Sequence, residues 1–277
     1  MRKVVQFFLD LLPTKVRAWL RQTLNPNYPP ENMHELYRQH VPPPEVCEST
    51  IGRIFLDHQG HETVKWGQYF EAYDRFLGPL RNGVRLPDGA TRTTRVLEIG
   101  VREGGSLQVL QRYFGACGEI VGVDLDERCR DIEVSPAHIR IGDQSDANFL
   151  LSVIAEFGTP DVVIDDGSHL PKHQIASFKT LWPLLNNNGV YIVEDLHTSY
   201  WREFDGGYKN RNGFVEFTKD AVDGIHRWYS RHKMTDRNKF AQTELKAVTV
   251  FDSLVAFEKK AFRKPVILRF GKPRTFR

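Results

Sequence analysis

Cysteine is scarce in this chain. The 277 residues include three cysteines, Cys47, Cys117 and Cys129, and no two of them form a CxxC pair. A framework of structural disulfides usually needs an even number of cysteines, and a cysteine zinc site needs paired ones. We therefore expect neither, which is typical of a protein from a reducing cytoplasm.

The sequence also lacks long apolar runs and a large excess of one charge. No run of about 18 apolar residues occurs, so we expect no transmembrane helix. The 38 lysines and arginines nearly balance the 35 aspartates and glutamates, for a net charge of +3. General nucleic-acid binding needs concentrated positive charge, so we expect no nucleic-acid partner. The composition is that of a globular protein.

The first 24 residues combine an apolar face with flanking basic and aromatic side chains. Asp10 and Pro13 interrupt the apolar part, so a cleaved secretory signal is a poor interpretation. Two interpretations stay open. The segment is either a helix packed on its own domain or on a second subunit of a homo-oligomer, or an interfacial helix in peripheral contact with the inner face of the membrane.

The patterning along the chain predicts three parts: a helical extension and linker over 1–94, a catalytic domain over 95–265 and a tail over 266–277. Short apolar runs alternate with helical stretches from Arg95 onwards, which is typical of repeated βαβ units. The segment KAVTVFDSLVAFEKK holds two extended runs that meet near Asp252. We therefore predict an α/β fold with a doubly wound, mostly parallel sheet and an antiparallel C-terminal edge.

Three predicted strands in succession end in acidic residues, and ligands of parallel sheets bind beyond these ends. The first end, LEIGVREGGS, has Arg102 where a dinucleotide fingerprint would have glycine, and a carboxylate at Glu98 that suits a cationic amino group better than pyrophosphate. This favours S-adenosylmethionine over NAD. Asp124 can accept from ribose hydroxyls and Asp143 from the adenine amino group. The full set of predicted cofactor contacts is Glu98, Gly100, Ser106, Asp124, Asp143, Gln144 and Asp165.

The fourth and fifth predicted strands, VVIDDGSH and YIVEDLH, bring four carboxylates to one edge of the sheet. Such a cluster is repulsive unless a cation compensates it, and oxygen ligands without cysteine favour Mg²⁺. We predict that Asp166, Glu194 and Asp195 hold the metal and that His169 removes a proton from a substrate hydroxyl. The alternative is that some of these acids cap helices. His197 is interpreted as a polar residue at the rim.

These segments resemble the macrocin and mycinamicin O-methyltransferases, a metal- and S-adenosylmethionine-dependent family with cephalosporin hydroxylase-like relatives. IDDGSH together with VEDLHTSYW is the most specific part of the resemblance, which spans about residues 95–260. It implies a Rossmann-like methyltransferase fold, Mg²⁺ on Asp166, Glu194 and Asp195, and His169 as general base. It also implies that Lys65 and Tyr69 in the upstream segment reach the cofactor, and that a sugar hydroxyl receives the methyl group.

The expected substrate is therefore a saccharide or glycoside, methylated in the cytoplasm. Residues 200–212 combine aromatics, glycines and cations, which indicates a lid over the sugar or an ordinary surface loop. The alternative functions are a cephalosporin hydroxylase-like protein, a catechol-type O-methyltransferase, and a non-catalytic cofactor-binding module docked to a membrane.

Overall fold

The computed structural model describes residues 42–231, 241–261 and 265–271. The chain divides into two units, Met1–Pro43 and Pro44–Arg277, and every element described here belongs to the second. The interpretations of residues 1–24 therefore lie outside the described residues. Within the described part, no helix combines the length and the apolar character that a membrane crossing requires.

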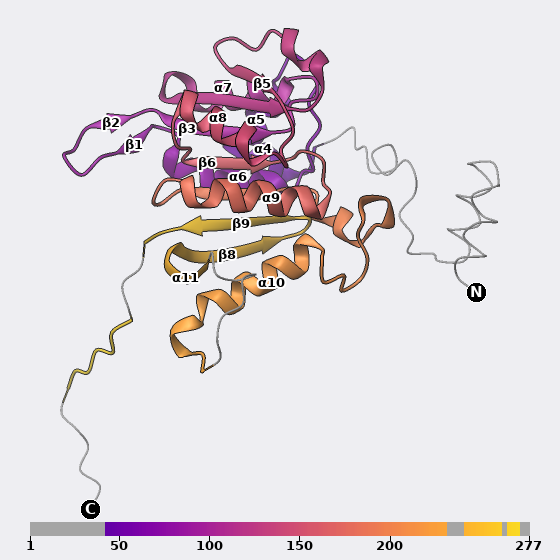
Figure 1. The fold of residues 1–277 in the computed structure, drawn as a ribbon. Coiled ribbons are helices and arrows are strands. Elements are labelled where there is room, and N and C mark those ends of the chain that lie inside the picture. The colour runs from indigo at the N-terminus through magenta and orange to yellow at the C-terminus, as the bar shows by residue number, and fades with distance from the viewer. Residues whose placement is uncertain (1–41, 232–240, 262–264, 272–277) are drawn as a thin grey trace, which may run out of the picture. The chain divides into compact units, whose positions relative to one another are not determined.

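A seven-stranded sheet forms the centre of this unit, with the strand order β5-β4-β3-β6-β7-β9-β8 (Figure 1). The first five strands in this order pair in parallel, whereas β9 is antiparallel to β7 and to β8. The predicted parallel sheet with an antiparallel C-terminal edge is thus confirmed. The strands are β3 Thr94–Ile99, β4 Gly118–Asp124, β5 His138–Ile141, β6 Val162–Asp165, β7 Val190–Val193, β8 Leu245–Phe251 and β9 Leu254–Lys259; β1 Val84–Arg85 and β2 Thr91–Arg92 form a separate small hairpin.

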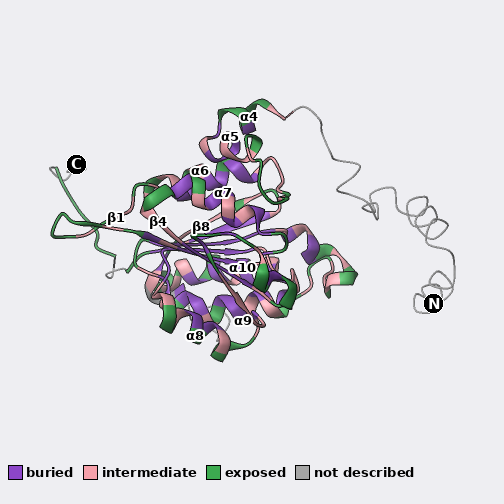
Figure 2. Cartoon of the chain, turned by 90° about the horizontal axis from the view of Figure 1, so that it is seen from above, coloured by how far each residue is buried: buried purple, intermediate pink, exposed green. Residues whose placement is uncertain are grey.

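Helices cover both faces of the sheet, and Figure 2 shows α4–α7 on one side of the strands and α8–α10 on the other. The α-helices are α4 Pro44–Glu48, α5 Thr50–Leu56, α6 Tyr69–Leu77, α7 Gly105–Phe114, α8 Ala147–Phe157, α9 Pro171–Leu181, α10 Phe214–Ile225 and α11 Ala241–Glu244. Short 3-10 helices are η1 Gly78–Leu80, η2 Gly115–Cys117, η3 Glu127–Asp131, η4 Trp182–Leu184, η5 Leu196–Tyr200, η6 Arg202–Phe204 and η7 Arg227–Tyr229.

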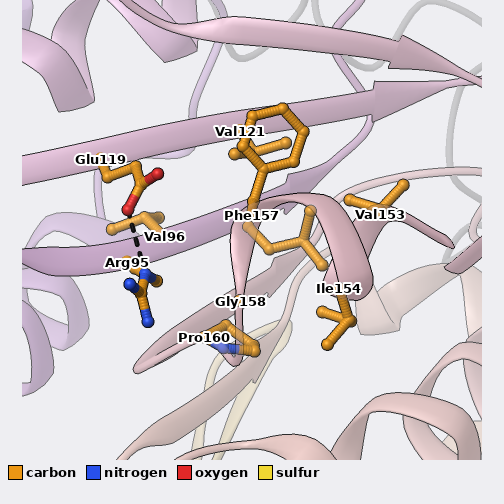
Figure 3. A pocket seen from close by; sticks show the side chains of 10 residues that line it. Arg95, Val96, Glu119, Val121, Val153, Ile154, Phe157, Gly158 and Pro160 are labelled. Atoms are coloured by element: carbon orange, nitrogen blue, oxygen red, sulfur yellow. Dashed lines mark hydrogen bonds and ion pairs between the residues drawn. The ribbon is translucent and has the colours of Figure 1, made fainter. Parts of the chain in front are cut away.

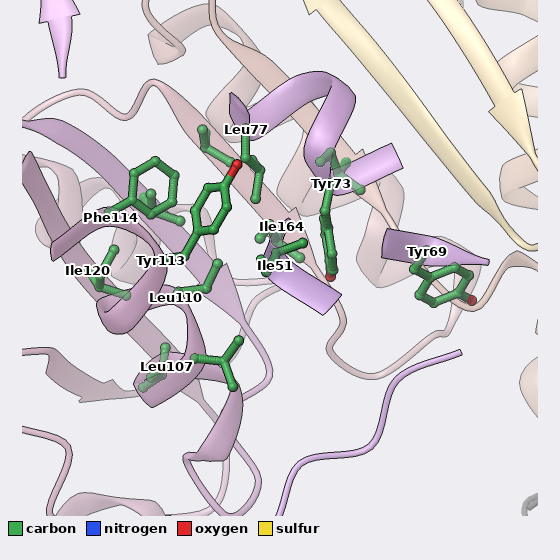
Figure 4. Packing of buried hydrophobic residues seen from close by; sticks show 14 of the residues in the cluster. Ile51, Tyr69, Tyr73, Leu77, Leu107, Leu110, Tyr113, Phe114, Ile120 and Ile164 are labelled. Carbon is green, nitrogen blue, oxygen red and sulfur yellow. The ribbon is translucent and has the colours of Figure 1, made fainter. Parts of the chain in front are cut away.

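Along each strand, the side chains alternate between two hydrophobic clusters because successive residues point to opposite faces of the sheet. Val96 of β3 belongs to the cluster under α4–α7, and its neighbour Leu97 belongs to the cluster under α8–α10. Figure 4 shows the first cluster, which includes Tyr69, Tyr73 and Leu77 of α6. Residues 44–94, assigned from the sequence to the extension, therefore contribute to the same core as the sheet.

Local signals set the beginnings and ends of the helices that flank the site. The Asp146 side chain accepts a hydrogen bond from the Asn148 amide at the start of α8, and α8 ends at Gly158, whose φ is 87°. Pro171 occupies the first turn of α9, where its missing N–H costs nothing. These boundaries leave the strand ends free to carry functional side chains.

A small pocket lies beside α8, near the beginnings of β3 and β4 (Figure 3). Val121, Val153 and Phe157 are among the residues that line it. The Arg95 Nε lies 3.0 Å from Glu119 Oε2 beside it. Since parallel sheets bind ligands at the carboxyl ends of their strands, this pocket lies at the wrong end of the sheet for the predicted chemistry.

Candidate active site

The carboxyl ends of β3, β6 and β7 lie side by side in the sheet. Ile99 pairs with Asp165, and Asp165 pairs with Val193. The residues that follow these positions therefore emerge at one edge of the sheet. This register brings Asp166 and Asp195 together, as the acidic strand ends predicted.

Asp166, His169 and Asp195 form a group whose ligand atoms all lie within 4.8 Å of one another. His169 Nε2 is 3.6 Å from Asp195 Oδ2, and the Nδ1 atom of His169 is buried without a hydrogen-bond partner among the described residues. Two carboxylates and an imidazole are a donor set that divalent cations accept. The residues present therefore fit a divalent metal ion.

The backbone at this group is strained. His169 has a φ of 56° and Asp195 a φ of 54°, both in the left-handed region that non-glycine residues rarely adopt. Such conformations persist only where the surrounding structure imposes them, and they concentrate at functional sites. The strain supports a functional interpretation of this edge of the sheet.

Lys65 places a buried ammonium among the acidic side chains. Its Nζ lies 2.6 Å from Asp166 Oδ2, 2.9 Å from Glu194 Oε2 and 3.8 Å from Glu98 Oε1. Burial lowers the pKa of Lys65, but attraction by Asp166 and Glu194 outweighs it and holds this pKa well above its ordinary value. Lys65 is therefore charged and contacts the predicted metal ligands, and the contact with the cofactor that the resemblance implied stays a prediction.

Glu194 is buried, and its oxygens are held by Lys65 and by the hydroxyl of Tyr73. Burial and the nearby Asp166 raise the pKa of Glu194 well above its ordinary value. Glu194 lies outside the group formed by Asp166, His169 and Asp195. Its role as a third metal ligand stays a prediction.

Tyr69 and Tyr73 extend from α6, on one face because they are four residues apart (Figure 4). The Tyr69 hydroxyl donates to Asp195 Oδ1 at 2.7 Å. Burial, followed by the charge of Asp195, raises the pKa of Tyr69, so this hydroxyl stays protonated. Helix α6 thus supplies one hydroxyl to each of two carboxylates, Tyr73 to Glu194 and Tyr69 to Asp195.

Aromatic rings stand beside the group of Asp166, His169 and Asp195. The ring of His197 lies 5.8 Å from that of Trp66 and 4.7 Å from that of Trp201, and Phe204 lies 6.1 Å from His169. His197 Nδ1 is 2.5 Å from Ser253 Oγ and 4.0 Å from Asp195 Oδ1. Aromatic faces of this kind can pack against the apolar face of a sugar ring.

The predicted cofactor contacts surround the end of β3. The Glu98 side chain is fully buried, accepts from Ser106 Oγ at 2.6 Å, and leaves Oε2 without a partner among the described residues. Burial raises the pKa of Glu98 to about 7. Gly100 has a φ of 97°, and a Cβ there would lie 2.2 Å from the carbonyl oxygen of Asp166. A glycine is therefore required where the two strand ends approach.

Asp124 and Asp143 use their carboxylates to shape the loops after β3 and β5. Asp124 Oδ2 accepts from the amides of Val101 and Arg102, at 2.7 and 3.0 Å. Asp143 Oδ1 accepts from the Ser145 amide at 2.7 Å, a bond that lowers the pKa of Asp143. Both stay predicted cofactor contacts.

Asp165 differs from the expectation, because its side chain is fully buried on the face of the sheet under α9. Its oxygens accept from Gln144 Nε2, Ser177 Oγ and Tyr191 OH. Gln144 Oε1 in turn accepts from the Ser168 amide at 2.7 Å. Asp165 thus positions Gln144 and the IDDGSH segment, and does not itself offer an oxygen to a ligand.

The segment after Asp195 folds into η5 and η6 and turns back at Gly206. The chain is closed there by hydrogen bonds from the amides of Gly206 and Gly207 to the carbonyls of Trp201 and Ser199. A Cβ at Gly206 would lie 2.6 Å from the carbonyl oxygens of Thr198, Ser199 and Trp201. This segment is therefore packed tightly against its own backbone.

We expect Gly206→Ala to lower the free energy of unfolding by about 1–3 kcal/mol, because three carbonyls must move to admit the methyl group. The measurement is urea unfolding of the full chain. Gly78→Ala is the matched control: Gly78 has a φ of −50°, and the atom nearest to its Cβ is the Tyr113 hydroxyl at 3.8 Å. The control should change the free energy by less than about 0.5 kcal/mol. Equal effects at both glycines would contradict the packing argument.

Comparison with protein families matches residues 97–196 to a methyltransferase domain. A tetracenomycin rhamnoside 2'-O-methyltransferase of Streptomyces olivaceus is 40% identical over 176 residues, which cover 60% of this chain and 44% of the relative. A second enzyme of Streptomyces olivaceus, the 3'-O-methyltransferase of the 2-methoxy-rhamnosyl tetracenomycin, is 31% identical over 221 residues. The aligned residues cover 76% of this chain and 53% of that enzyme. The chain thus spans about half the length of these curated relatives.

Among solved structures, the MycE methyltransferase of the mycinamycin biosynthetic pathway, in complex with Mg, SAH and mycinamycin VI, aligns with a TM-score of 0.62 at 27% identity. The alignment covers 79% of this chain and 54% of that one. The mycinamicin VI 2''-O-methyltransferase of Micromonospora griseorubida is 38% identical over 141 residues, which cover 48% of this chain and 33% of the relative. The predicted resemblance to macrocin- and mycinamicin-type O-methyltransferases, and the Rossmann-like methyltransferase fold, are confirmed.

Proposed function

We propose that this chain is an O-methyltransferase that moves a methyl group from S-adenosylmethionine to a sugar hydroxyl of a glycoside, with the help of a divalent ion such as Mg²⁺. The observation that carries the proposal is the group of Asp166, His169 and Asp195 at the strand ends, beside the end of β3 that carries Glu98. Rhamnoside and mycinamicin methyltransferases among the relatives support a glycosylated natural product as the substrate.

Each part of the site has an assigned task. Glu98, with one oxygen left unpaired, binds the cationic amino group of the cofactor, and the loop that Asp124 holds carries Gly100. Asp166 and Asp195 hold the divalent ion, with Glu194 as the third predicted ligand. The cofactor supplies the methyl group, and the ion lowers the pKa of the hydroxyl that is to be methylated.

His169 takes the proton in this reaction. As the sugar oxygen forms its bond to the methyl carbon, the bond from that carbon to sulfur breaks, and the hydroxyl proton passes to the imidazole. The aromatic rings of Trp66, Trp201 and Phe204 hold the sugar ring and exclude water from the transfer. The products are the methyl ether, S-adenosylhomocysteine and a proton.

The test incubates the full chain with S-adenosylmethionine and rhamnosylated polyketides, with and without EDTA. We expect a product heavier by about 14 Da, the difference between methyl and hydrogen. EDTA should abolish its formation, and added Mg²⁺ should restore it. Transfer that persists in EDTA would overturn the metal-dependent mechanism, and oxygen addition in place of methylation would favour the hydroxylase-like alternative.

A further inference from the structure

Lys65 belongs to the segment that precedes α6, yet it reaches the ends of three strands. Its Nζ contacts Asp166 and Glu194 at hydrogen-bond distance and lies 3.8 Å from Glu98. Its side chain is 5% exposed. In the part of the chain that the structure describes, Lys65 is the only lysine or arginine paired with these carboxylates.

Lys65 alone cannot balance the acidic side chains at this edge of the sheet when they are ionised. Glu98, Asp166, Glu194 and Asp195 bring four carboxylates together, against the single ammonium of Lys65. Buried carboxylates are costly unless a cation or protons compensate them. Lys65 thus gives the site part of its compensation before any ion binds.

The same position brings Lys65 into competition with a divalent ion. Asp166 belongs to the group that fits the metal and is also the residue closest to Lys65 Nζ, at 2.6 Å. A divalent ion held by Asp166 is therefore a near neighbour of the ammonium, and like charges a few ångströms apart in a buried site repel strongly.

We propose that Lys65 is a positioning residue that acts as a built-in competitor of the metal ion. It holds Asp166 and Glu194 in place when no metal is bound, connects them to Glu98, and keeps the affinity for the divalent ion lower than the carboxylates alone would give. This inference rests on the metal dependence of the proposed function, and it gives the charge of Lys65 a measurable effect on ion binding.

The experiment measures Mn²⁺ binding to the full chain by following the EPR signal of the free ion. We expect Lys65→Gln to bind Mn²⁺ at least about tenfold more tightly than the unaltered chain, because a repelling charge is removed. Lys65→Arg keeps the charge and should stay within about threefold of the unaltered chain. Lys219→Gln is the control, because Lys219 is 59% exposed and pairs with Glu216 on α10.

Thermal unfolding adds a second measurement, the rise in melting temperature on adding Mn²⁺, which a merely structural role of Lys65 would not enlarge. Without metal, Lys65→Gln should melt at a lower temperature than the unaltered chain, since its carboxylates have lost their cation. Saturating Mn²⁺ should raise the melting temperature of Lys65→Gln by more than it raises that of the unaltered chain. Should this variant not fold without metal, refolding it in Mn²⁺ gives the same comparison.

Each outcome decides the proposal without an activity assay. Weaker or unchanged Mn²⁺ binding in Lys65→Gln overturns it, as does Lys65→Arg tightening the affinity as much as the glutamine variant does. Binding by Lys65→Gln together with no binding by the unaltered chain supports the competition and counts against the metal dependence of the proposed function. No binding by either chain overturns both.

Discussion

His169→Ala is expected to lower kcat about 10²–10⁴-fold, the range that removal of a general base produces. His169 Nε2 lies 3.6 Å from Asp195 Oδ2, so the imidazole is placed beside the carboxylates that would hold the metal and the hydroxyl. The affinity for S-adenosylmethionine should change by less than about twofold, because the base acts on the acceptor hydroxyl. Steady-state kinetics and calorimetric titration with the cofactor give the two quantities.

The control is His138→Ala, an exposed histidine at the beginning of β5, at the opposite end of the strand from the site. It should leave kcat unchanged. Mn²⁺ binding to His169→Ala separates two roles, since His169 also belongs to the group that fits a metal. A loss of Mn²⁺ affinity parallel to the loss of kcat would assign His169 to the metal, and an unchanged kcat would remove it from the chemistry.

Phe178→Ala is expected to lower the free energy of unfolding by about 3–5 kcal/mol, the usual cost of truncating a buried aromatic ring. Phe178 on α9 is fully buried. Its ring lies 5.2 Å from that of Trp182 and 4.8 Å from those of Tyr191 and Phe257. The cavity left by the ring is surrounded by large rigid side chains, so it cannot collapse easily.

Denaturation with urea measures this loss, and Leu151→Ala is the control. Leu151 lies on α8 and is 45% exposed. Its truncation should cost less than about 0.5 kcal/mol, as is usual for surface substitutions. A loss of less than about 1 kcal/mol in Phe178→Ala would show that the contacts around α9 rearrange freely. Such a small loss would contradict the interpretation that α9 holds Tyr191 and Asp165 rigidly behind the site.

The sheet and much of the candidate site could be predicted from local patterns. Apolar runs that end in acidic residues gave the strands, and the rule that parallel strands bind ligands at their carboxyl ends brought Glu98, Asp166 and Asp195 to one edge. The burial of Asp165, which was expected to contact the cofactor, could not be predicted in the same way. Neighbouring residues point to opposite faces, and the register that buries Asp165 depends on packing against α9.

The support from α6 and from the segment before it could not be predicted from local patterns. Lys65 and Tyr73 contact residues that lie 101 and 121 positions later in the chain. No periodicity connects segments so far apart, and the family resemblance alone pointed to the upstream segment. Tyr69 and Tyr73 share one face of α6 because four residues separate them, but the partners of their hydroxyls follow from the way α6 packs on the sheet.

The order of the strands determines when the site can be completed during protein synthesis. Strand β9 is made after β8 but inserts between β8 and β7, and the turn before it brings Ser253 to the site. There the Ser253 carbonyl accepts from the Leu196 amide, and its hydroxyl lies 3.1 Å from that of Tyr69. A nascent chain that ends before residue 254 therefore has β7 as an open sheet edge. The ribosome must translate through β9 before Asp195, which follows β7, gains its final neighbours.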